Sequence, residues 1–266
     1  MTKDRAEQHE PHGSAQMTAV IAMHPSRFGA IRSLVSFQDF RLKLSAVHAL
    51  ADEQQKASRY RVHFQPIDQG ELLDAQRLAQ VARVYGRSAQ FDGDVFDSVL
   101  QWLSGEDETT EAVVSFSALS LEDELFVPRL IEIAERHQVA PQRLWLELDQ
   151  TVFHPHEEDV KEGLEAMRQA GFHTGLQRGG GMALELAASG LVDYFTVSRR
   201  HVGNMLEDQK RADAVRAMGQ MAKIMNVGLI ADGVDCYERL GALIEAGVSH
   251  ACGPLFGDSR LVTVNH

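Results

Sequence analysis

Four carboxylates are spaced so that they could meet at one edge of a sheet and hold a divalent cation. Glu147 and Asp149 are two residues apart in an expected strand, so both could face the same side. Asp232 and Asp235 follow another expected strand, on either side of Gly233-Val234. Hard cations prefer carboxylate oxygens, and a two-metal site needs several of them. The set suits one loose metal site; the plain alternative is that these acids cap helices or bind water.

Other stretches carry reactive residue types in weaker patterns. Residues 177–181, Gln-Arg-Gly-Gly-Gly, could cradle a phosphate, but they match neither the P-loop nor the dinucleotide pattern, and a flexible loop is the alternative. The His-Pro-His of residues 154–156 precedes acidic residues 157–159, which indicates a helix start rather than a metal site. Residues 199–201, Arg-Arg-His, favour a solvated loop over a phosphate site. Cys252 is expected to be a buried thiol.

Strand and helix patterns alternate along the chain and position these residues. Strands are expected at 61–67, 112–117, 143–149, 172–177, 194–198, 227–231 and 250–253, and helices at 76–84, 91–103, 121–138, 157–170, 182–188, 208–225 and 237–246. This spacing predicts parallel βαβ units in an α/β fold, a (β/α)8 barrel of the TIM type with a doubly wound open sheet as the competitor. A turn at 68–70 lets residues 71–75 pair back on the first strand as a hairpin. In either fold, chemistry belongs at the carboxyl ends of the strands.

Composition limits the class of protein and its partners. The chain has 266 residues and a formal net charge of −12, which argues against binding to nucleic acid or to an anionic membrane surface. Two cysteines and no long apolar run favour a reduced, cytoplasmic setting. Residues 1–17 are expected to be a disordered polar tail, 18–41 an N-terminal extension and 42–262 the barrel. Within them, 31–56 are expected to form a helix that packs across the barrel end, with a partner-binding surface as the alternative.

Five short motifs at the strand ends resemble the EAL domain, in the family's order. They are 64–67 (like "QPI"), 143–151 ("LELTES"), 193–199 ("DYLKIDR"), 230–235 ("VAEGVE") and 253–256 ("QGYLF"). That family consists of cyclic di-GMP phosphodiesterases and their inactive relatives, built as a modified TIM barrel. The resemblance spans roughly residues 42–260 and implies that fold.

The resemblance also implies that this chain departs from the family at its site. The family's metal-binding Glu falls on Gln76, and its paired Asp residues fall on Gln177 and Arg178. Further family positions differ as well, namely Gln80, Ser115, Gln150, Thr196, Ser198 and Cys252. Arg178 would place a positive charge where a metal sits, which costs about 4 kcal/mol per unit charge at ~4 Å and an effective dielectric of ~20. The remaining acids are Glu147, Asp232 and Asp235, so we expect no catalytic residue, bound metal or cofactor.

Three functions follow from the resemblance. The leading interpretation is a non-catalytic regulator that acts through contact with another protein in bacterial signalling, of the motility or biofilm type. The alternative is a metal-independent cyclic di-GMP receptor that would use Gln65, Arg178, Asp232 and Asp235. The second alternative is a residual or divergent phosphodiesterase with a single metal on Glu147, Asp232 and Asp235. A homodimer stays open, because the family often dimerises around the loop that residues 177–182 replace here.

Overall fold

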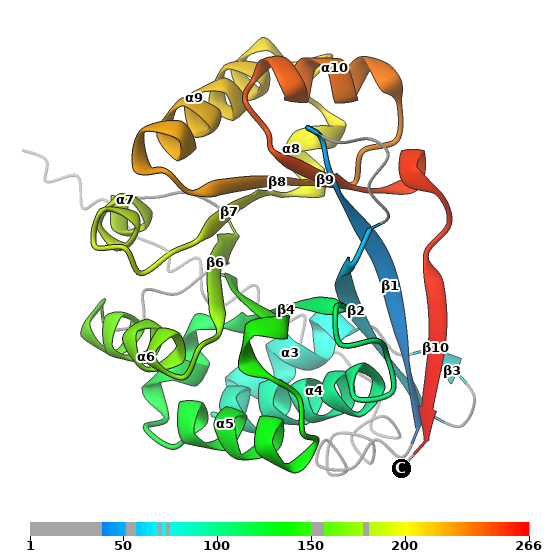
Figure 1. Cartoon of the computed structure of the whole chain (residues 1–266), viewed down its shortest axis with the longest axis vertical. Helices are drawn as coiled ribbons and strands as arrows, with labels where there is room; N and C mark the ends of the chain where they lie inside the picture. Colours follow the sequence, from blue (N-terminus) through cyan, green and yellow to red (C-terminus); the bar gives the residue numbers. More distant parts are fainter. Residues whose placement is uncertain are drawn as a thin grey trace, which may run out of the picture.

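The computed structural model describes residues 39–51, 57–68, 71–72, 75–149, 157–177 and 181–265, in which strands and helices alternate (Figure 1). The strands are β1 Asp39–Ala49, β2 Arg59–Asp68, β3 Glu71–Leu72, β4 Glu111–Ser117, β5 Leu144–Asp149, β6 His173–Gln177, β7 Tyr194–Val197, β8 Gly228–Asp232, β9 His250–Cys252 and β10 Arg260–Asn265. The helices are α3 Ala75–Val84, α4 Ser88–Leu103, α5 Phe126–Arg136, α6 Glu157–Gln169, α7 Gly181–Ala188, α8 Arg199–Gly203, α9 Gln209–Met225 and α10 Tyr237–Glu245. Short 3-10 helices are η2 Ala118–Glu122, η3 Pro141–Arg143 and η4 Pro254–Phe256. The tail predicted at 1–17 lies outside the described residues.

Eight of the strands close into a barrel. Parallel pairing runs from β2 through β4, β5, β6, β7 and β8 to β9. β1 closes the ring because it pairs antiparallel with β2 on one side and with β9, through His48 and Ala49, on the other. β10 lies antiparallel along residues 39–44 of β1, and β3 pairs back on β2. The predicted barrel and hairpin are therefore confirmed, and the open sheet is excluded.

β1 corrects the expectation for residues 31–56. The apolar spacing predicts a helix there, but residues 39–49 form a strand. Phe40, Leu42 and Leu44 are buried, whereas Arg41 is exposed and Lys43 is half-buried. These residues alternate with the period of two of a strand that has one face on the core. The helical prediction is wrong because it rested on apolar residues spaced three and four apart. Residues 31–38 and 52–56 lie outside the described part of the chain.

Two other predictions need correction. The helix expected at 121–138 is split into η2 and α5, because Asp123 is extended and its carboxylate accepts a hydrogen bond from the Leu125 amide, 3.0 Å away. The solvated loop expected at 199–201 is the short helix α8, which follows directly on β7. The helix start predicted near 157 is confirmed by α6, whose first turn carries three acids. No helix among the described residues combines the length and apolar character needed to cross a bilayer.

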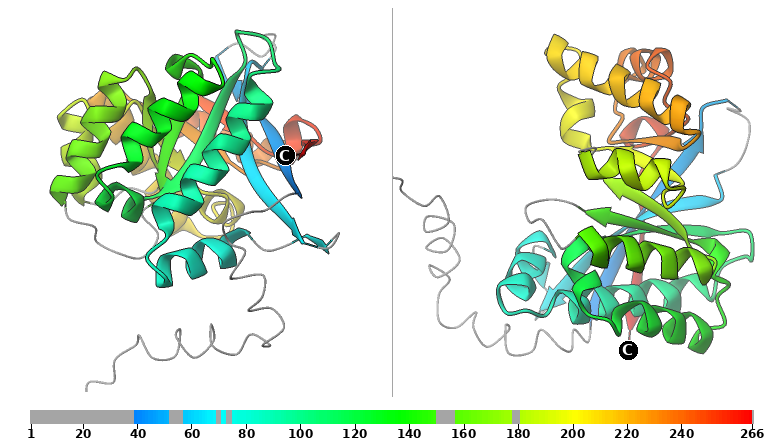
Figure 2. Two further views of the ribbon diagram at one scale, coloured as in Figure 1. Left: turned by 90° about the horizontal axis from the view of Figure 1, so that it is seen from below. Right: turned by 90° about the vertical axis from the view of Figure 1, so that its left-hand side faces the viewer.

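The barrel separates an outer core from a small inner layer. Helices cover the outside of the ring (Figure 2), and side chains alternate between the two faces of each strand. On β5, the three leucines belong to the core under the helices, whereas Trp145 packs against the inner layer. The inner layer consists of Val47, Val113, Tyr194, Ile230 and Cys252. Cys252 also borders the site described below, and the other members fill the ring on the N-terminal side of that site.

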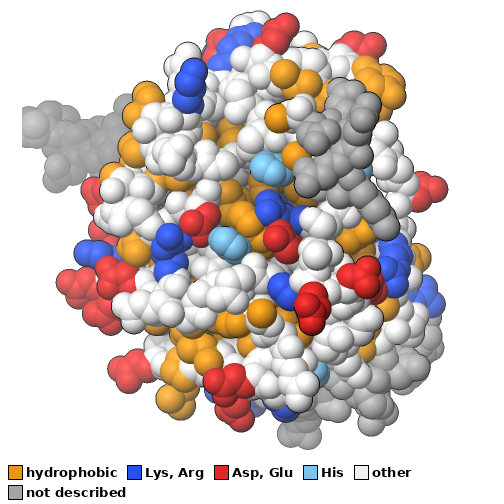
Figure 3. All heavy atoms as spheres, in the orientation of Figure 1, with side chains coloured by type: hydrophobic (Ala, Val, Ile, Leu, Met, Phe, Trp, Pro, Cys, Tyr) orange, Lys and Arg blue, Asp and Glu red, His pale blue; other side chains and the backbone are white. Residues whose placement is uncertain are grey.

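Charged and aromatic groups close the N-terminal end of the barrel. Arg59 pairs with Glu111 at 2.7 Å, and its guanidinium lies 3.4 Å from the ring centroid of Trp145. His173 stacks on the same indole, with ring centroids 4.1 Å apart. The face drawn in Figure 3 shows basic, acidic and histidine side chains gathered over the middle of the barrel. These contacts stabilise one end of the ring and leave the carboxyl ends of the strands as the place for a site.

Candidate functional site

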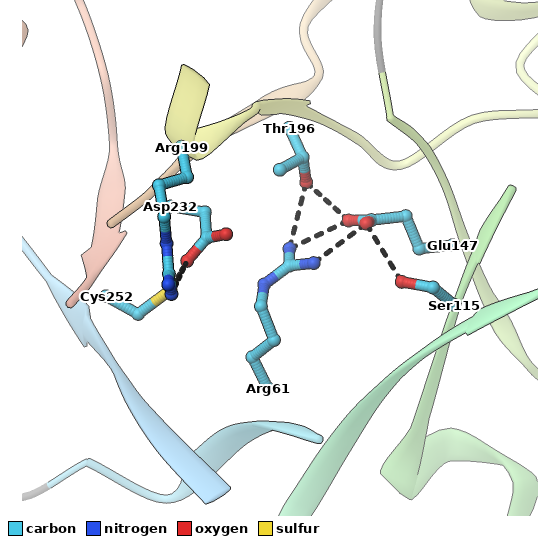
Figure 4. A network of polar contacts seen from close by, with 7 residues as sticks. All are labelled: Arg61, Ser115, Glu147, Thr196, Arg199, Asp232 and Cys252. Atoms are coloured by element: carbon cyan, nitrogen blue, oxygen red, sulfur yellow. Dashed lines mark hydrogen bonds and ion pairs between the residues drawn. The ribbon is translucent and has the colours of Figure 1, made fainter. Parts of the chain in front are cut away.

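A buried ion pair crosses the barrel interior toward the carboxyl ends of the strands (Figure 4). Arg61 of β2 reaches Glu147 of β5 with both terminal nitrogens, each 2.8 Å from a carboxylate oxygen. Their side chains are 3% and 0% exposed. Thr196 of β7 accepts a hydrogen bond from Arg61 at 3.1 Å and donates one to Glu147, and Ser115 of β4 donates to Glu147 at 3.2 Å. Each oxygen of Glu147 therefore accepts two hydrogen bonds.

This network keeps both members of the pair charged. Burial alone would raise the pKa of Glu147, but the charge and hydrogen bonds of Arg61, helped by Thr196 and Ser115, hold it below the ordinary value. Burial would likewise lower the pKa of Arg61, yet the carboxylate of Glu147 raises it well above the usual range. The bidentate geometry is the strongest form of such a pair in proteins.

A second polar group lies beside this pair, at the end of β8. Asp232 is 7% exposed, and its Oδ1 is 3.5 Å from Cys252 Sγ and 3.6 Å from a terminal nitrogen of Arg199. Burial raises the pKa of Cys252 to about 12, so the thiol keeps its proton and can donate to Asp232. Gly233 has a φ of +84°, and an added Cβ would lie 2.5 Å from Arg199 Cγ. The glycine therefore makes room for the Arg199 side chain at the mouth of the barrel.

The side chains around Glu147 do not fit a divalent cation. Both carboxylate oxygens already contact a guanidinium, and a metal in their reach would be repelled by that fixed positive charge. Within the part of the chain that the structure describes, no three His, Cys, Asp or Glu side chains are grouped as metal ligands would be. Glu147 is the partner of an internal cation in this structure.

The structure brings most of the described candidate positions to one mouth. Three of them, Ser115, Glu147 and Thr196, surround Arg61, and Asp232 with Cys252 lies next to them (Figure 4). Ser115 is exposed, so the mouth is open to solvent at this point. The interior position of these residues follows from the alternation along β4, β5, β7, β8 and β9.

Asp235 is the candidate that the structure places elsewhere. Its side chain is 49% exposed and forms an ion pair with Arg239, four residues later at the start of α10. Arg239 also donates to the Gly203 carbonyl at 2.8 Å. Arg239 therefore links α10 to the end of α8, and Asp235 is its carboxylate partner; Asp235 is not among the residues that contact Glu147 or Asp232.

The other candidate positions are glutamines and one arginine. Gln65 lies on β2 and Gln177 at the end of β6, where it pairs in register with Thr196. Gln76 lies in the first turn of α3. Gln150 and Arg178 lie outside the described residues.

Arg61 is the residue that sequence reasoning missed. Its signal is the alternation along β2, where Tyr60, Val62 and Phe64 belong to or pack on the outer core. Arg61 and His63 stand between them and therefore face into the barrel. A charged residue at an inward position of a barrel strand is itself a sign of a partner, because buried charges are paired.

Comparison with known proteins identifies the family. The sequence pattern of the EAL domain matches residues 30–259. The chain belongs to the EAL domain family. This confirms the resemblance that the motifs at the strand ends indicated, and it covers the whole barrel from before β1 to the start of β10.

Relatives of this EAL chain include one curated protein and many solved structures. The chain is 22% identical over 193 residues to a probable cyclic di-GMP phosphodiesterase, PdeA of Escherichia coli (strain K12), and the match covers 71% of this chain but about a quarter, 26%, of that protein. The EAL domain of Xanthomonas citri FimX, in complex with c-diGMP, has a TM-score of 0.74 at 17% identity, covering 93% of this chain and 96% of that one. The PaMucR phosphodiesterase in its c-di-GMP complex has a TM-score of 0.73 at 16% identity, covering 83% and 96%. These structures share the fold.

Proposed function

We propose that this chain is a non-catalytic EAL protein that regulates bacterial signalling, of the motility or biofilm type, through contact with another protein. The observation that carries the proposal is the buried Arg61–Glu147 pair. Glu147 is the acid that matches the family's metal-binding pattern, and its two oxygens are 2.8 Å from the guanidinium nitrogens. A carboxylate so bound has no position left for a metal that two-metal hydrolysis requires.

The residues at the other family positions support the same proposal. Gln76, Gln177 and Arg178 stand where the family pattern has acids. Amide oxygens can ligate a cation but bring no negative charge to offset it, and an arginine repels it. Thr196 replaces the lysine of the family pattern and hydrogen-bonds to Glu147. With the chemistry weakened and the barrel retained, docking to a partner is the activity that the scaffold can still supply.

Two measurements test this proposal. The purified chain is incubated with cyclic di-GMP and Mg2+ or Mn2+, and the linear product is followed by chromatography beside an active EAL phosphodiesterase. We expect no turnover. Metal-dependent turnover that Glu147→Gln abolishes would instead establish the divergent phosphodiesterase. In parallel, a tagged chain is used to isolate stoichiometric partners, each then tested for direct binding as a purified protein; the absence of any such partner under varied growth conditions contradicts the docking function.

A metal-independent cyclic di-GMP receptor is the second candidate, and one observation favours it. FimX EAL domains of the same fold have been solved with c-di-GMP bound, from Xanthomonas citri and from Pseudomonas aeruginosa. The mouth of this barrel is open at Ser115 and carries cationic side chains that could contact phosphate directly. Calorimetric titration with cyclic di-GMP, in EDTA and then in Mg2+, tests it. A flat titration in both buffers excludes the receptor, and binding in EDTA supports it.

A further inference from the structure

The strand β10 lies at the edge of the antiparallel part of the sheet. It pairs with β1, β1 pairs with β2 and β2 pairs with β3, so β10 and β3 are the two ends of this part. β3 is 2 residues long, whereas β10 has 6 residues. Figure 1 shows β10, in red, running along the outside of the ribbon beside β1. A long edge strand of this kind is a template for pairing with another strand.

One side of β10 is paired and the other is not, within the residues that the structure describes. β1 is its one strand partner there, in an unbroken register from Arg260 opposite Leu44 to Asn265 opposite Asp39. Residues 260–264 form no other backbone hydrogen bond with the described part of the chain. In an antiparallel pair, alternate residues turn their N–H and C=O groups to the partner strand. The remaining groups of β10 therefore point away from β1, along a free edge.

β10 lacks the features with which proteins usually block an edge strand. Such edges commonly carry lysine, proline or a β-bulge. The sequence of β10 is Arg-Leu-Val-Thr-Val-Asn, and its register with β1 contains no bulge. Its one charged side chain, Arg260, is 2.8 Å from Glu106 in the turn after α4. The middle of the strand consists of aliphatic and β-branched residues, which are the types that favour strand pairing.

One face of β10 packs on the core and the other is exposed. Val264 is buried and Val262 packs on the outer core, and their partners on β1 are Phe40 and Leu42. Leu261 points to the other face and is 58% exposed. Among the described residues, the other large apolar side chains with such exposure lie on helices or in connecting segments. An exposed leucine beside unpaired backbone groups is a surface that an added strand would cover.

We propose that this edge pairs with the same edge of a second copy of the chain, antiparallel about a two-fold axis beside Val262. The axis places Val262 opposite its own copy on the core face, and Leu261 opposite Thr263 of the second copy on the other face. Arg260 then lies opposite Val264 of the second copy, so no two charged side chains of the pair oppose each other. Each copy supplies a strand of equal length and the backbone groups that the other leaves unpaired.

The chemistry of the edge favours a second copy over a charged peptide. Residues 261–264 carry no charge that would select an acidic or a basic segment, and a two-fold contact needs a surface that is complementary to itself. The edge also lies across the ring from β6 and the loop that follows it, since β6 is reached from β1 through β2, β4 and β5 or through β9, β8 and β7. This self-pairing is independent of the docking function proposed above.

Sedimentation velocity of the purified chain over a range of concentrations tests the proposal. One strand pair is a small interface beside the standard ~800 Å2 per partner, so we expect a reversible dimer that forms at micromolar concentrations. Each copy has a net charge of −12, so added salt should strengthen the dimer by screening their repulsion.

Two matched variants locate the contact. Leu261→Glu should weaken the dimer about tenfold or more, because two carboxylates would lie diagonally across the axis. Lys43 lies opposite residue 261 on β1, so the introduced carboxylate has a cation beside it and the monomer should stay folded. Ile224→Glu makes the same change at a side chain that is 80% exposed on α9, and it should dimerise as the wild type does.

Hydrogen exchange followed by mass spectrometry examines the same edge in the unmodified chain. Amides of residues 260–264 should exchange more slowly as the protein concentration rises, whereas those of α9 should not change. A chain that stays monomeric at every concentration overturns the inference, as does a dimer that both glutamate variants weaken equally. Exchange in β10 that does not depend on concentration overturns it as well, because the edge is then open or covered within one chain.

Discussion

The two sides of the barrel wall carry opposite charges to the same mouth. The parallel strands β5 and β8 bring Glu147 and Asp232, whereas the antiparallel pair β1–β2 brings Lys43 and Arg61. The walls meet in the Arg61–Glu147 pair, buried at 3% and 0% exposure. A strand across the barrel therefore decides what an acid at a strand end contacts, since Arg61 of β2 occupies both oxygens of Glu147.

Replacing Arg61 should have the largest effect, because it removes the contact in which the two walls meet. Arg61→Met leaves Glu147 fully buried without its cation, and removing one partner of a buried pair typically destabilises a protein by about 3–5 kcal/mol. Urea unfolding monitored by circular dichroism measures the loss. The double variant Arg61→Met, Glu147→Leu should recover much of it, because two apolar side chains leave no charge unpaired.

The control is an exposed ion pair on a helix. Arg216 and Asp213 are 2.6 Å apart on α9, with 53% and 60% of their side chains exposed. Arg216→Met should change the unfolding free energy by less than about 1 kcal/mol, since exposed ion pairs contribute little. Equal losses for Arg61→Met and Arg216→Met would show that the two walls do not depend on each other.

Gly175 of β6 leaves room for the Tyr194 ring inside the barrel. An added Cβ there would lie 2.1 Å from Cζ of Tyr194, whose ring is 1% exposed in the inner layer. Gly175→Ala should therefore destabilise the fold by about 1–3 kcal/mol, the usual range for overpacking. Adding Tyr194→Leu should restore part of that loss in thermal unfolding. Gly241→Ala, whose Cβ meets nothing within 4 Å, is the control and should be neutral or stabilising.

The parallel strands, β2 among them, could be predicted from the sequence, whereas β1 could not. Seven parallel strands and their helices have separate apolar patterns of ordinary length, so periodicity placed them within a few residues. β1 alternates apolar and basic residues over 40–44, but the apolar residues on either side are also spaced as in a helix. Its pairing with β2, β9 and β10 is a tertiary contact that no local pattern carries.

The candidate site also has a part that the sequence predicts and a part that it does not. Ser115, Glu147, Thr196, Asp232 and Cys252 lie at strand ends, and their clustering follows from parallel pairing alone. That Glu147 contacts Arg61 depends on the length and direction of a side chain from across the ring. Sequence spacing groups Asp235 with Asp232, yet the turn after β8 places Asp235 at the surface.

Asp92 is a buried carboxylate that, among the described residues, contacts hydrogen-bond donors and no cation, in contrast to Glu147. It lies in α4 and accepts hydrogen bonds from the Ser117 amide, at 2.8 Å, and from the Ser120 hydroxyl, at 2.5 Å, at the end of β4. Burial raises its pKa to about 7, the opposite direction to Glu147. Because the folded pKa exceeds the unfolded value of about 3.9, the folded state binds this proton more tightly, and stability is lost as the pH rises from ~4 through ~7.

Asp92→Asn should remove that pH dependence while keeping an acceptor oxygen for both serines. Urea unfolding at pH 5 should give similar free energies for the variant and the wild type, and at pH 8 the variant should be more stable by about 1–2 kcal/mol. Glu124→Gln, an exposed acid between η2 and α5, is the control and should leave the profile unchanged. A wild-type profile that rises from pH 5 to pH 8 relative to Asp92→Asn would contradict the assignment.

The smallest effect should come from Asp235, the acid that leaves the mouth. It is 49% exposed and paired with Arg239, so Asp235→Asn should change the unfolding free energy by less than about 1 kcal/mol. Asp232→Asn, by contrast, changes an acid that is 7% exposed and lies 3.6 Å from Arg199, and it should destabilise the fold more than Asp235→Asn does. Equal losses for the two variants in urea unfolding would mean that the burial of Asp232 at the mouth does not strengthen its contact with Arg199.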